Sequence, residues 1–193
     1  NEKLILNTGI RYDHDSESGG STNPRLAMIY KAQPETTLKL LYGTAFRGPN
    51  AYERYYNFGY VFNPDLKSEK ITTTELAVEH QFRENLRGTA SLFNYKIDNL
   101  IGLTTLPSGD LSFQNSNMEA KGLELEAESI WAGDSRLKGS VSWQLARSSD
   151  TGEWLDNSPR SLVNLNYTTP VLCDSARVGV EMQFVSSRLN THG

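Results

Sequence analysis

Apolar and polar residues alternate with a two-residue period along most of this 193-residue chain. The clearest run, at residues 123–131, reads LELEAESIW. A helix would spread these side chains around its circumference, whereas a strand places them on opposite faces. The alternation therefore predicts an all-β chain, built as an antiparallel meander of long strands.

About nine strands are expected. The pattern places them at residues 3–13, 24–32, 36–46, 70–83, 86–98, 111–131 (with room for a break near 115–117), 135–147, 160–169 and 175–187. Many of these runs have about ten or more residues, whereas strands of soluble domains usually have about five or six. A strand that crosses a bilayer needs about 9–11 residues. Strand length therefore favours a membrane-spanning sheet.

The connections alternate between short and long. Tight turns are predicted at residues 33–35, 83–85, 132–134 and 170–174, and longer loops at 14–23, 47–69, 99–110 and 148–159. Short turns on one rim and long loops on the other are typical of outer-membrane barrels. A Greek-key sandwich has no such regularity. Aromatic residues near predicted strand ends fit an interfacial girdle, although aromatics favour strands in any setting: Tyr12, Tyr30, Tyr42, Phe46, Phe82, Trp131 and Tyr167.

Composition excludes several classes. The formal charge of −4 gives no basic footprint, so we expect no nucleic-acid partner. No apolar run approaches the roughly 18 residues of a membrane helix. A membrane β-barrel remains open, because half of every barrel strand is polar and hydropathy stays low.

Carboxylates are the main candidates for chemistry, and each has a simpler interpretation. Glutamates two apart on one strand, as in residues 124–128, form a solvated ladder far more often than a tuned acid–base pair. The loop Asp13-His14-Asp15 groups oxygen and nitrogen ligands but lacks ligand spacing. His80 falls among apolar-face residues and is expected to pack there. We therefore assign no catalytic residue, no metal site and no cofactor.

The loop at residues 47–69 carries the best candidate binding surface. It holds four Tyr and one Phe within residues 52–60, with Arg and Asn among them. Rigid amphipathic rings beside adaptable donors are typical of recognition surfaces. The alternative is a loop that packs its own aromatics. The candidate ligand contacts are Arg47, Tyr52, Tyr55 and Tyr56.

Several segments of the chain resemble the TonB-dependent outer-membrane receptors. The segments at residues 23–30 and 37–53 are similar to adjacent barrel strands of that family leading into a surface loop. Residues 63–70 with 74–76 resemble its "NP.L.PE…E" segment, with Ser68 where Pro is usual. A further set resembles the next hairpin: Tyr95, Asp98, Ile101, Asn115, Asn117, Ala120, Gly122 and Glu124. The resemblance covers nearly the whole chain.

The resemblance implies a section of a 22-stranded transmembrane β-barrel in a Gram-negative outer membrane, with residues 1–193 forming one partial barrel domain. It implies import of a ferric siderophore, cobalamin or haem-type ligand, energised by the TonB complex through a plug domain. We expect that plug, the early strands and the terminal aromatic strand to lie outside this stretch, as in a piece of a longer protein, with lipid as the remaining partner. The alternative is a soluble β-sandwich module for carbohydrate binding or adhesion, which would fold alone without detergent.

Overall fold

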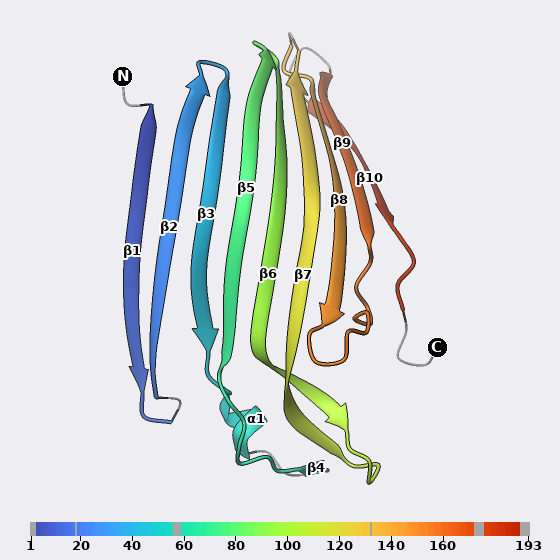
Figure 1. Cartoon of the computed structure of the whole chain (residues 1–193). Coiled ribbons are helices and arrows are strands. Elements are labelled where there is room, and N and C mark those ends of the chain that lie inside the picture. Colours follow the sequence, from blue (N-terminus) through green and yellow to red (C-terminus); the bar gives the residue numbers. More distant parts are fainter. Residues whose placement is uncertain (1–2, 18, 56–58, 132, 172–175, 190–193) are drawn as a thin grey trace.

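The structure is a computed structural model that describes residues 3–17, 19–55, 59–131, 133–171 and 176–189. It consists of long strands and one short helix (Figure 1). The elements are β1 (Leu4–Asp15), β2 (Gly19–Gln33), β3 (Thr36–Arg47), α1 (Ala51–Tyr55), β4 (Tyr60–Val61), β5 (Glu69–Arg83), β6 (Leu86–Thr105), β7 (Leu111–Ile130), β8 (Arg136–Ser148), β9 (Ser161–Val171) and β10 (Ala176–Val185).

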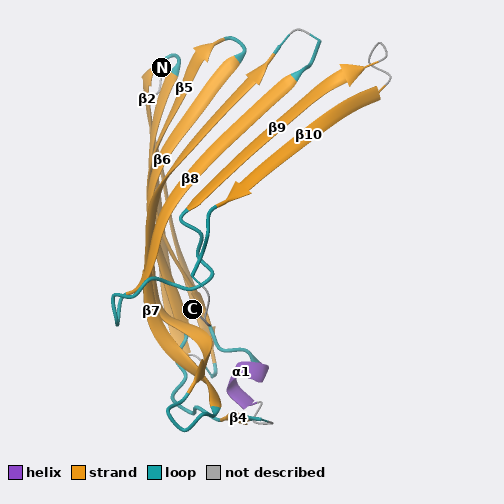
Figure 2. Ribbon diagram, turned by 90° about the vertical axis from the view of Figure 1, so that its right-hand side faces the viewer, coloured by secondary structure: helices purple, strands orange, loops and turns teal. Residues whose placement is uncertain are grey.

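The strands form one ten-stranded sheet. Nine long strands lie in chain order and each pairs antiparallel with the next, while β4 pairs in parallel with β7. The predicted all-β meander is confirmed. Figure 2 shows the sheet as a single curved layer with β9 and β10 sweeping to one side. Within the described residues no second sheet packs on it, so the sandwich alternative has no support.

Register sorts the side chains onto two faces. Directly opposed residues on successive strands form an apolar row: Met28, Leu40, Leu76, Leu92, Leu123 and Trp143. We call this side of the sheet the apolar face. Its side chains are open rather than packed, since Leu76, Leu92 and Trp143 are 48%, 55% and 46% exposed. A soluble protein does not leave so continuous an apolar surface uncovered.

The opposite side, the polar face, carries charges joined across strands. Lys39 Nζ lies 2.5 Å from Glu79 Oε1, and Lys138 Nζ lies 3.0 Å from Glu126 Oε2. The Glu128 side chain is only 3% exposed and lies between the guanidinium groups of Arg87 and Arg136. Burying a carboxylate is costly unless it is paired, and two arginines meet that requirement here. The predicted glutamate ladder at residues 124–128 therefore exists, but it is not solvated along its whole length. Glu126 and Glu128 pair with cations on neighbouring strands and Glu128 is buried, whereas Glu124 is exposed and accepts a hydrogen bond from Ser142 Oγ at 3.3 Å.

Three sequence predictions of the connections need correction. Residues 99–110 were expected to be a long loop, but β6 runs to Thr105 and β7 begins at Leu111 without a break at residues 115–117. A register shift between Ile97 and Leu100, with Asn99 at φ 57°, absorbs the extra residues within the hairpin. The loop at 14–23 is shorter than expected because β2 begins at Gly19.

The predicted tight turns at 33–35 and 83–85 are present. Pro170 lies within β9 rather than in a turn, and residues 172–174 lie outside the described residues. The loop at 47–69 contains α1 and β4, which the alternation did not predict. None of the described residues forms a helix long and apolar enough to span a bilayer.

Candidate functional site: the long-loop rim

The helix α1 begins at a reciprocal cap. Asn50 Oδ1 accepts a hydrogen bond from the Glu53 backbone N–H at 2.9 Å, and Glu53 Oε2 accepts one from the Asn50 N–H at 2.8 Å. This capping box satisfies two backbone donors that a helix start leaves free. A five-residue helix is marginal alone, so these bonds and its tertiary contacts hold it in place. Figure 2 shows α1 and β4 on the concave side of the sheet, at the end where the long loops lie.

Arg47, at the end of β3, joins α1 to the sheet. Its guanidinium contacts Glu53 at 2.8 Å and Glu69, the first residue of β5, at 2.7 Å. Glu69 Oε1 also accepts a hydrogen bond from the Ile101 backbone N–H at 2.8 Å. Arg47 therefore ties β3 to β5 and to the helix, and Glu69 extends this connection to β6.

The same contacts set the ionisation of Glu53. Burial raises the pKa of the Glu53 carboxyl, but the hydrogen bonds from Arg47 and from the Asn50 N–H outweigh burial and hold this pKa below 4.5. Glu53 is therefore a carboxylate at neutral pH. A fixed charge pair of this kind orders the loop more strongly than exposed pairs do.

Glu17 connects α1 to the tip between β1 and β2. Its Oε2 accepts hydrogen bonds from Arg54 Nη1 and from the Tyr55 hydroxyl, both at 3.1 Å. Glu17 and Arg54 are 37 residues apart in sequence. These bonds fix the last turn of α1 against a loop contributed by the first hairpin.

Tyr52 points its ring into an aromatic group. The ring centroid lies 6.2 Å from that of Tyr60 and 5.8 Å from that of Phe113, with edge-on geometry in both pairs. Such pairs contribute about 0.5–1.5 kcal/mol beyond area burial. Beneath them Ser112 is fully buried, and its hydroxyl donates to the Val61 carbonyl at 2.8 Å. Tyr52 nevertheless remains 47% exposed.

Two asparagines on β7 join the remaining loops. Asn115 Oδ1 accepts from the Lys67 N–H at 2.8 Å, and its Nδ2 donates to the carbonyls of Lys67 and Asn99. Asn117 Oδ1 accepts from the Asn99 N–H at 2.9 Å, and its Nδ2 donates to Asp150 Oδ1 at 2.8 Å. The resemblance singled out both residues. In the structure they join the β3–β5 connection and the β8–β9 connection to the paired strands β6 and β7.

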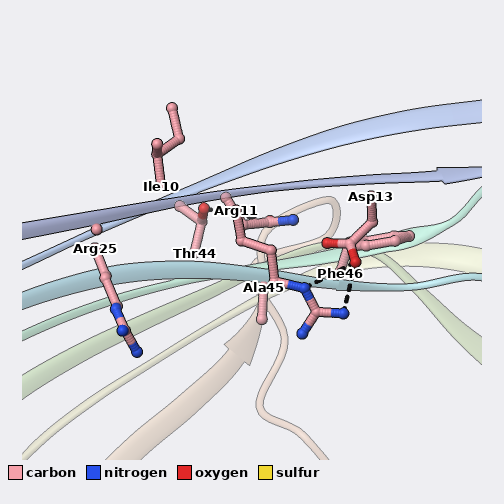
Figure 3. A pocket seen from close by; sticks show the side chains of 9 residues that line it. Ile10, Arg11, Asp13, Arg25, Thr44, Ala45 and Phe46 are labelled. Atoms are coloured by element: carbon pink, nitrogen blue, oxygen red, sulfur yellow. Dashed lines mark hydrogen bonds and ion pairs between the residues drawn. The ribbon is translucent and has the colours of Figure 1, made fainter.

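A cavity of about 330 Å³ lies on the first three strands at this end of the sheet. In Figure 3, Arg25 and Ile10 point to opposite sides of the ribbons, and dashed lines join Arg11 to Asp13. Arg11 Nε donates to Asp13 Oδ1 at 2.8 Å.

Arg25 lies over Gly9, where an added Cβ would come within 2.7 Å of Arg25 Nε. In the described part of the chain no carboxylate pairs with Arg25. Sequence reasoning missed Arg25, whose signal is an arginine on the polar face of β2 near the long-loop end of that strand.

The structure thus gathers three of the four proposed contacts. Arg47, Tyr52 and Tyr55 lie on or beside α1, whereas Tyr56 lies outside the described residues. Arg47 is shared between two carboxylates, while Tyr55 is 60% exposed. The one local sequence pattern that indicates part of this arrangement is Asn50-x-x-Glu53, which is typical of a capped helix start.

The other candidates have structural partners. No three His, Cys, Asp or Glu side chains among the described residues lie close enough to hold a metal ion. Asp13 pairs with Arg11, and Asp15 Oδ1 accepts the Glu17 N–H at 3.0 Å. His80 Nδ1 lies 2.8 Å from Thr36 Oγ1 and its ring stands edge-on to Phe82 at 4.6 Å. His80 therefore packs at the face, as expected.

A single curved sheet of long strands, apolar on one side and charged on the other, with all long loops joined at one rim, is the wall of a transmembrane β-barrel. The chain belongs to the TonB dependent receptor-like β-barrel family, whose model matches residues 1–188. That family is one of outer-membrane transporters and receptors.

Relatives agree with this assignment. The chain is 31% identical over 130 residues to the vitamin B12 transporter BtuB of Vibrio cholerae, covering 66% of this chain and 20% of the transporter. It is 25% identical over 221 aligned residues to the heme/hemopexin utilization protein C of Haemophilus influenzae, covering 92% and 30%. The chain thus spans about a fifth to a third of these relatives.

A solved structure supports the fold. The ferric enterobactin receptor PfeA of Pseudomonas aeruginosa superimposes with a TM-score of 0.78 at 19% identity, covering 96% of this chain and 31% of the receptor. At this identity the likeness establishes the fold alone.

Proposed function

We propose that this chain is the wall and surface loops of an outer-membrane receptor that takes up a scarce ligand of the ferric siderophore, cobalamin or haem type. TonB would supply the energy through a plug domain, and the apolar face would meet membrane lipid. The family match and the ligands in the names of the relatives, vitamin B12 and heme, support this proposal. Under this proposal the chain binds a ligand and lines its path through the membrane, and it catalyses no reaction.

The observation that carries the proposal is the exposed aromatic surface on a fixed helix. Tyr52 and Tyr55 are 47% and 60% exposed on α1, although the helix itself is held by Arg47, Glu17 and the capping box. Aromatic side chains that are already ordered lose little conformational entropy when a ligand binds. Their rings can then stack on, or donate hydrogen bonds to, a planar or chelated ligand.

Charge has two roles in the proposed site. Arg47 positions α1 and leaves only part of its guanidinium for a ligand, because Glu53 and Glu69 occupy the rest. Arg25 offers a cation on the polar face below the rim, with no carboxylate partner among the described residues. Guanidinium groups complement anionic chelates well. A ligand captured at α1 would therefore meet Arg25 as it moves inward.

The test is equilibrium binding to the full-length protein in detergent, with ferric enterobactin, cyanocobalamin and haemin as probes. For the probe that binds, Tyr52→Ala and Tyr55→Ala should each weaken affinity about two- to tenfold, as expected for about 0.5–1.5 kcal/mol per aromatic contact. Tyr56→Ala belongs in the same series.

The matched control is Tyr167→Ala, since Tyr167 is 39% exposed and lies on the apolar face, away from the rim. It should leave affinity unchanged. Unchanged affinity in all three rim variants would overturn the residue assignment. Failure of every probe class to bind would overturn the proposed function itself.

A further inference from the structure

A groove of about 710 Å³ crosses the apolar face over β6, β7 and β8. Its apolar wall comes from Leu92, Leu123, Trp143 and Leu145. Leu92 on β6 is directly opposed to Leu123 on β7, and Leu123 is directly opposed to Trp143 on β8. Three of the four side chains are at least 44% exposed, so the groove is open along its length.

A lysine stands at the long-loop end of this groove. Lys121 belongs to the same face as Leu123 and Leu125, since side chains two residues apart on a strand share a side. It is opposed to Asn94 on β6 and Leu145 on β8, and it lines the groove with them. Lys121 therefore lies about 7 Å beyond the Leu123 row, at a strand rise of about 3.3 Å per residue.

The charge on Lys121 is not neutralised within the described part of the chain. Two nearby cations on the same face have carboxylate partners: Lys96 pairs with Asp98 at 3.0 Å, and Arg147 pairs with Glu119 at 3.5 Å. Lys121 is exposed and pairs with no carboxylate among the described residues. Arg160 lines the same end of the groove and places its guanidinium carbon 4.4 Å from the Trp154 ring centroid.

We propose that this groove is a binding site for a membrane lipid with a phosphorylated headgroup, in the leaflet on the long-loop side. An acyl chain lies along Leu92, Leu123, Trp143 and Leu145, and the phosphate contacts the Lys121 ammonium, with Arg160 adding positive charge. The charge complementarity selects the lipid, because an unpaired cation beside an apolar groove at membrane depth fits an anionic amphiphile better than a neutral one.

This inference goes beyond ligand uptake, because it concerns the opposite face of the sheet. It shares with the proposed function only the membrane setting. The lipid can bind whether or not α1 contacts an imported ligand, so the two proposals fail independently.

The experiment is native mass spectrometry of the full-length protein in detergent, titrated with dipalmitoyl phosphatidylglycerol. Dipalmitoyl phosphatidylcholine, with the same chains and a zwitterionic headgroup, and glycerol 3-phosphate, the headgroup without chains, are the comparison probes. We expect phosphatidylglycerol to bind more tightly than phosphatidylcholine, and glycerol 3-phosphate not to bind.

Lys121→Gln should reduce the preference for phosphatidylglycerol about fivefold, the ratio for about 1 kcal/mol per lysine near an anionic surface. Lys70→Gln is the matched control, since Lys70 is an exposed lysine at the start of β5 that does not line the groove. It should bind both lipids as the parent does.

Three results would overturn the proposal. Equal binding of the two lipids would show that the headgroup is not recognised. An unchanged preference in Lys121→Gln would show that Lys121 does not contact the phosphate. Binding of glycerol 3-phosphate as tight as that of the lipid would show a phosphate site rather than a lipid site.

Discussion

The ring of Phe93 on β6 lies directly over Gly122 on β7. The two residues are opposed in the register, and a Cβ added at Gly122 would come within 2.7 Å of Phe93 Cζ and would also meet the Trp143 carbonyl oxygen. Phe93 in turn stacks on Tyr95, with ring centroids 4.7 Å apart. Gly122 thus provides the space in which Phe93, buried on the polar face, packs beside Tyr95.

Gly122→Ala should therefore destabilise the sheet. The new methyl group must displace Phe93 or the β8 backbone, and overpacking of this kind costs about 1–3 kcal/mol. The measurement is urea unfolding of the full-length protein in lipid vesicles. Gly102→Ala is the control, because Gly102 is also in β6–β7 pairing but has no atom within 4 Å of an added Cβ. Equal stability of the two variants would contradict the packing described for Gly122.

Replacing Arg47 should release α1. Arg47→Gln leaves Glu53 and Glu69 without their shared cation, and a hydrogen bond to a charged group contributes about 1.5–3 kcal/mol. We expect faster amide hydrogen exchange at residues 50–55, with exchange in β9 unchanged. Arg177→Gln, which removes an exposed pair with Asp134 at 3.5 Å, should change neither. Unchanged exchange at 50–55 in Arg47→Gln would show that the helix does not depend on this ion pair.

Acid should loosen the same helix. Because the pKa of Glu53 is held below its usual 4.5, its contribution to stability is complete above about pH 4.5 and is lost as pH falls through the lowered folded-state pKa. Hydrogen-exchange protection of α1, corrected for intrinsic rates, should therefore fall below pH 4.5 and stay level above it. In Glu53→Gln this acid-dependent loss should shrink to the part that protonation of Glu69, the other carboxylate on Arg47, contributes. A pH profile identical to that of the parent would assign the acid sensitivity to another group.

Asn115→Ala should loosen two segments together, the connection before β5 and the end of β6 beyond its bulge. It removes one hydrogen bond accepted from Lys67 and two donated to the carbonyls of Lys67 and Asn99, each contributing about 0.5–1.5 kcal/mol. Limited proteolysis should then cut faster within both residues 62–68 and 99–110. Asn166→Ala, in the polar-face row of β9, is the control and should resist cleavage as the parent does. Faster cleavage in only one segment would show that Asn115 does not couple them.

The strands could be predicted from sequence because the two-residue period is a local property. The run at 123–131 sets Leu123 and Glu124 on opposite faces in the structure, as it does in the sequence. The extension of β6 and β7 could not be predicted this way. Asn, Gly and Pro between residues 99 and 110 indicate a loop, whereas Asn99 adopts a positive φ that lets pairing resume beyond a bulge.

The site could be predicted only in part. Composition identified the Tyr-rich loop, and the pattern Asn50-x-x-Glu53 contains the capping box. Its positioning depends on contacts between residues far apart in the chain, such as Tyr55 with Glu17 at a separation of 38 residues. No local pattern reports such contacts, because they arise from the register of the whole sheet.

The central claim is that the apolar face meets hydrocarbon while the polar face borders water. Its most direct test is a spin-label scan of β5 in the full-length protein in vesicles, with single cysteines at residues 74–79 in a Cys173→Ser background. We expect oxygen accessibility to peak at Leu76 and Val78, and accessibility to a water-soluble nickel chelate to peak at Glu75 and Glu79. Accessibility without a two-residue period, or labels at Leu76 and Val78 shielded from both reagents, would contradict a membrane-facing sheet.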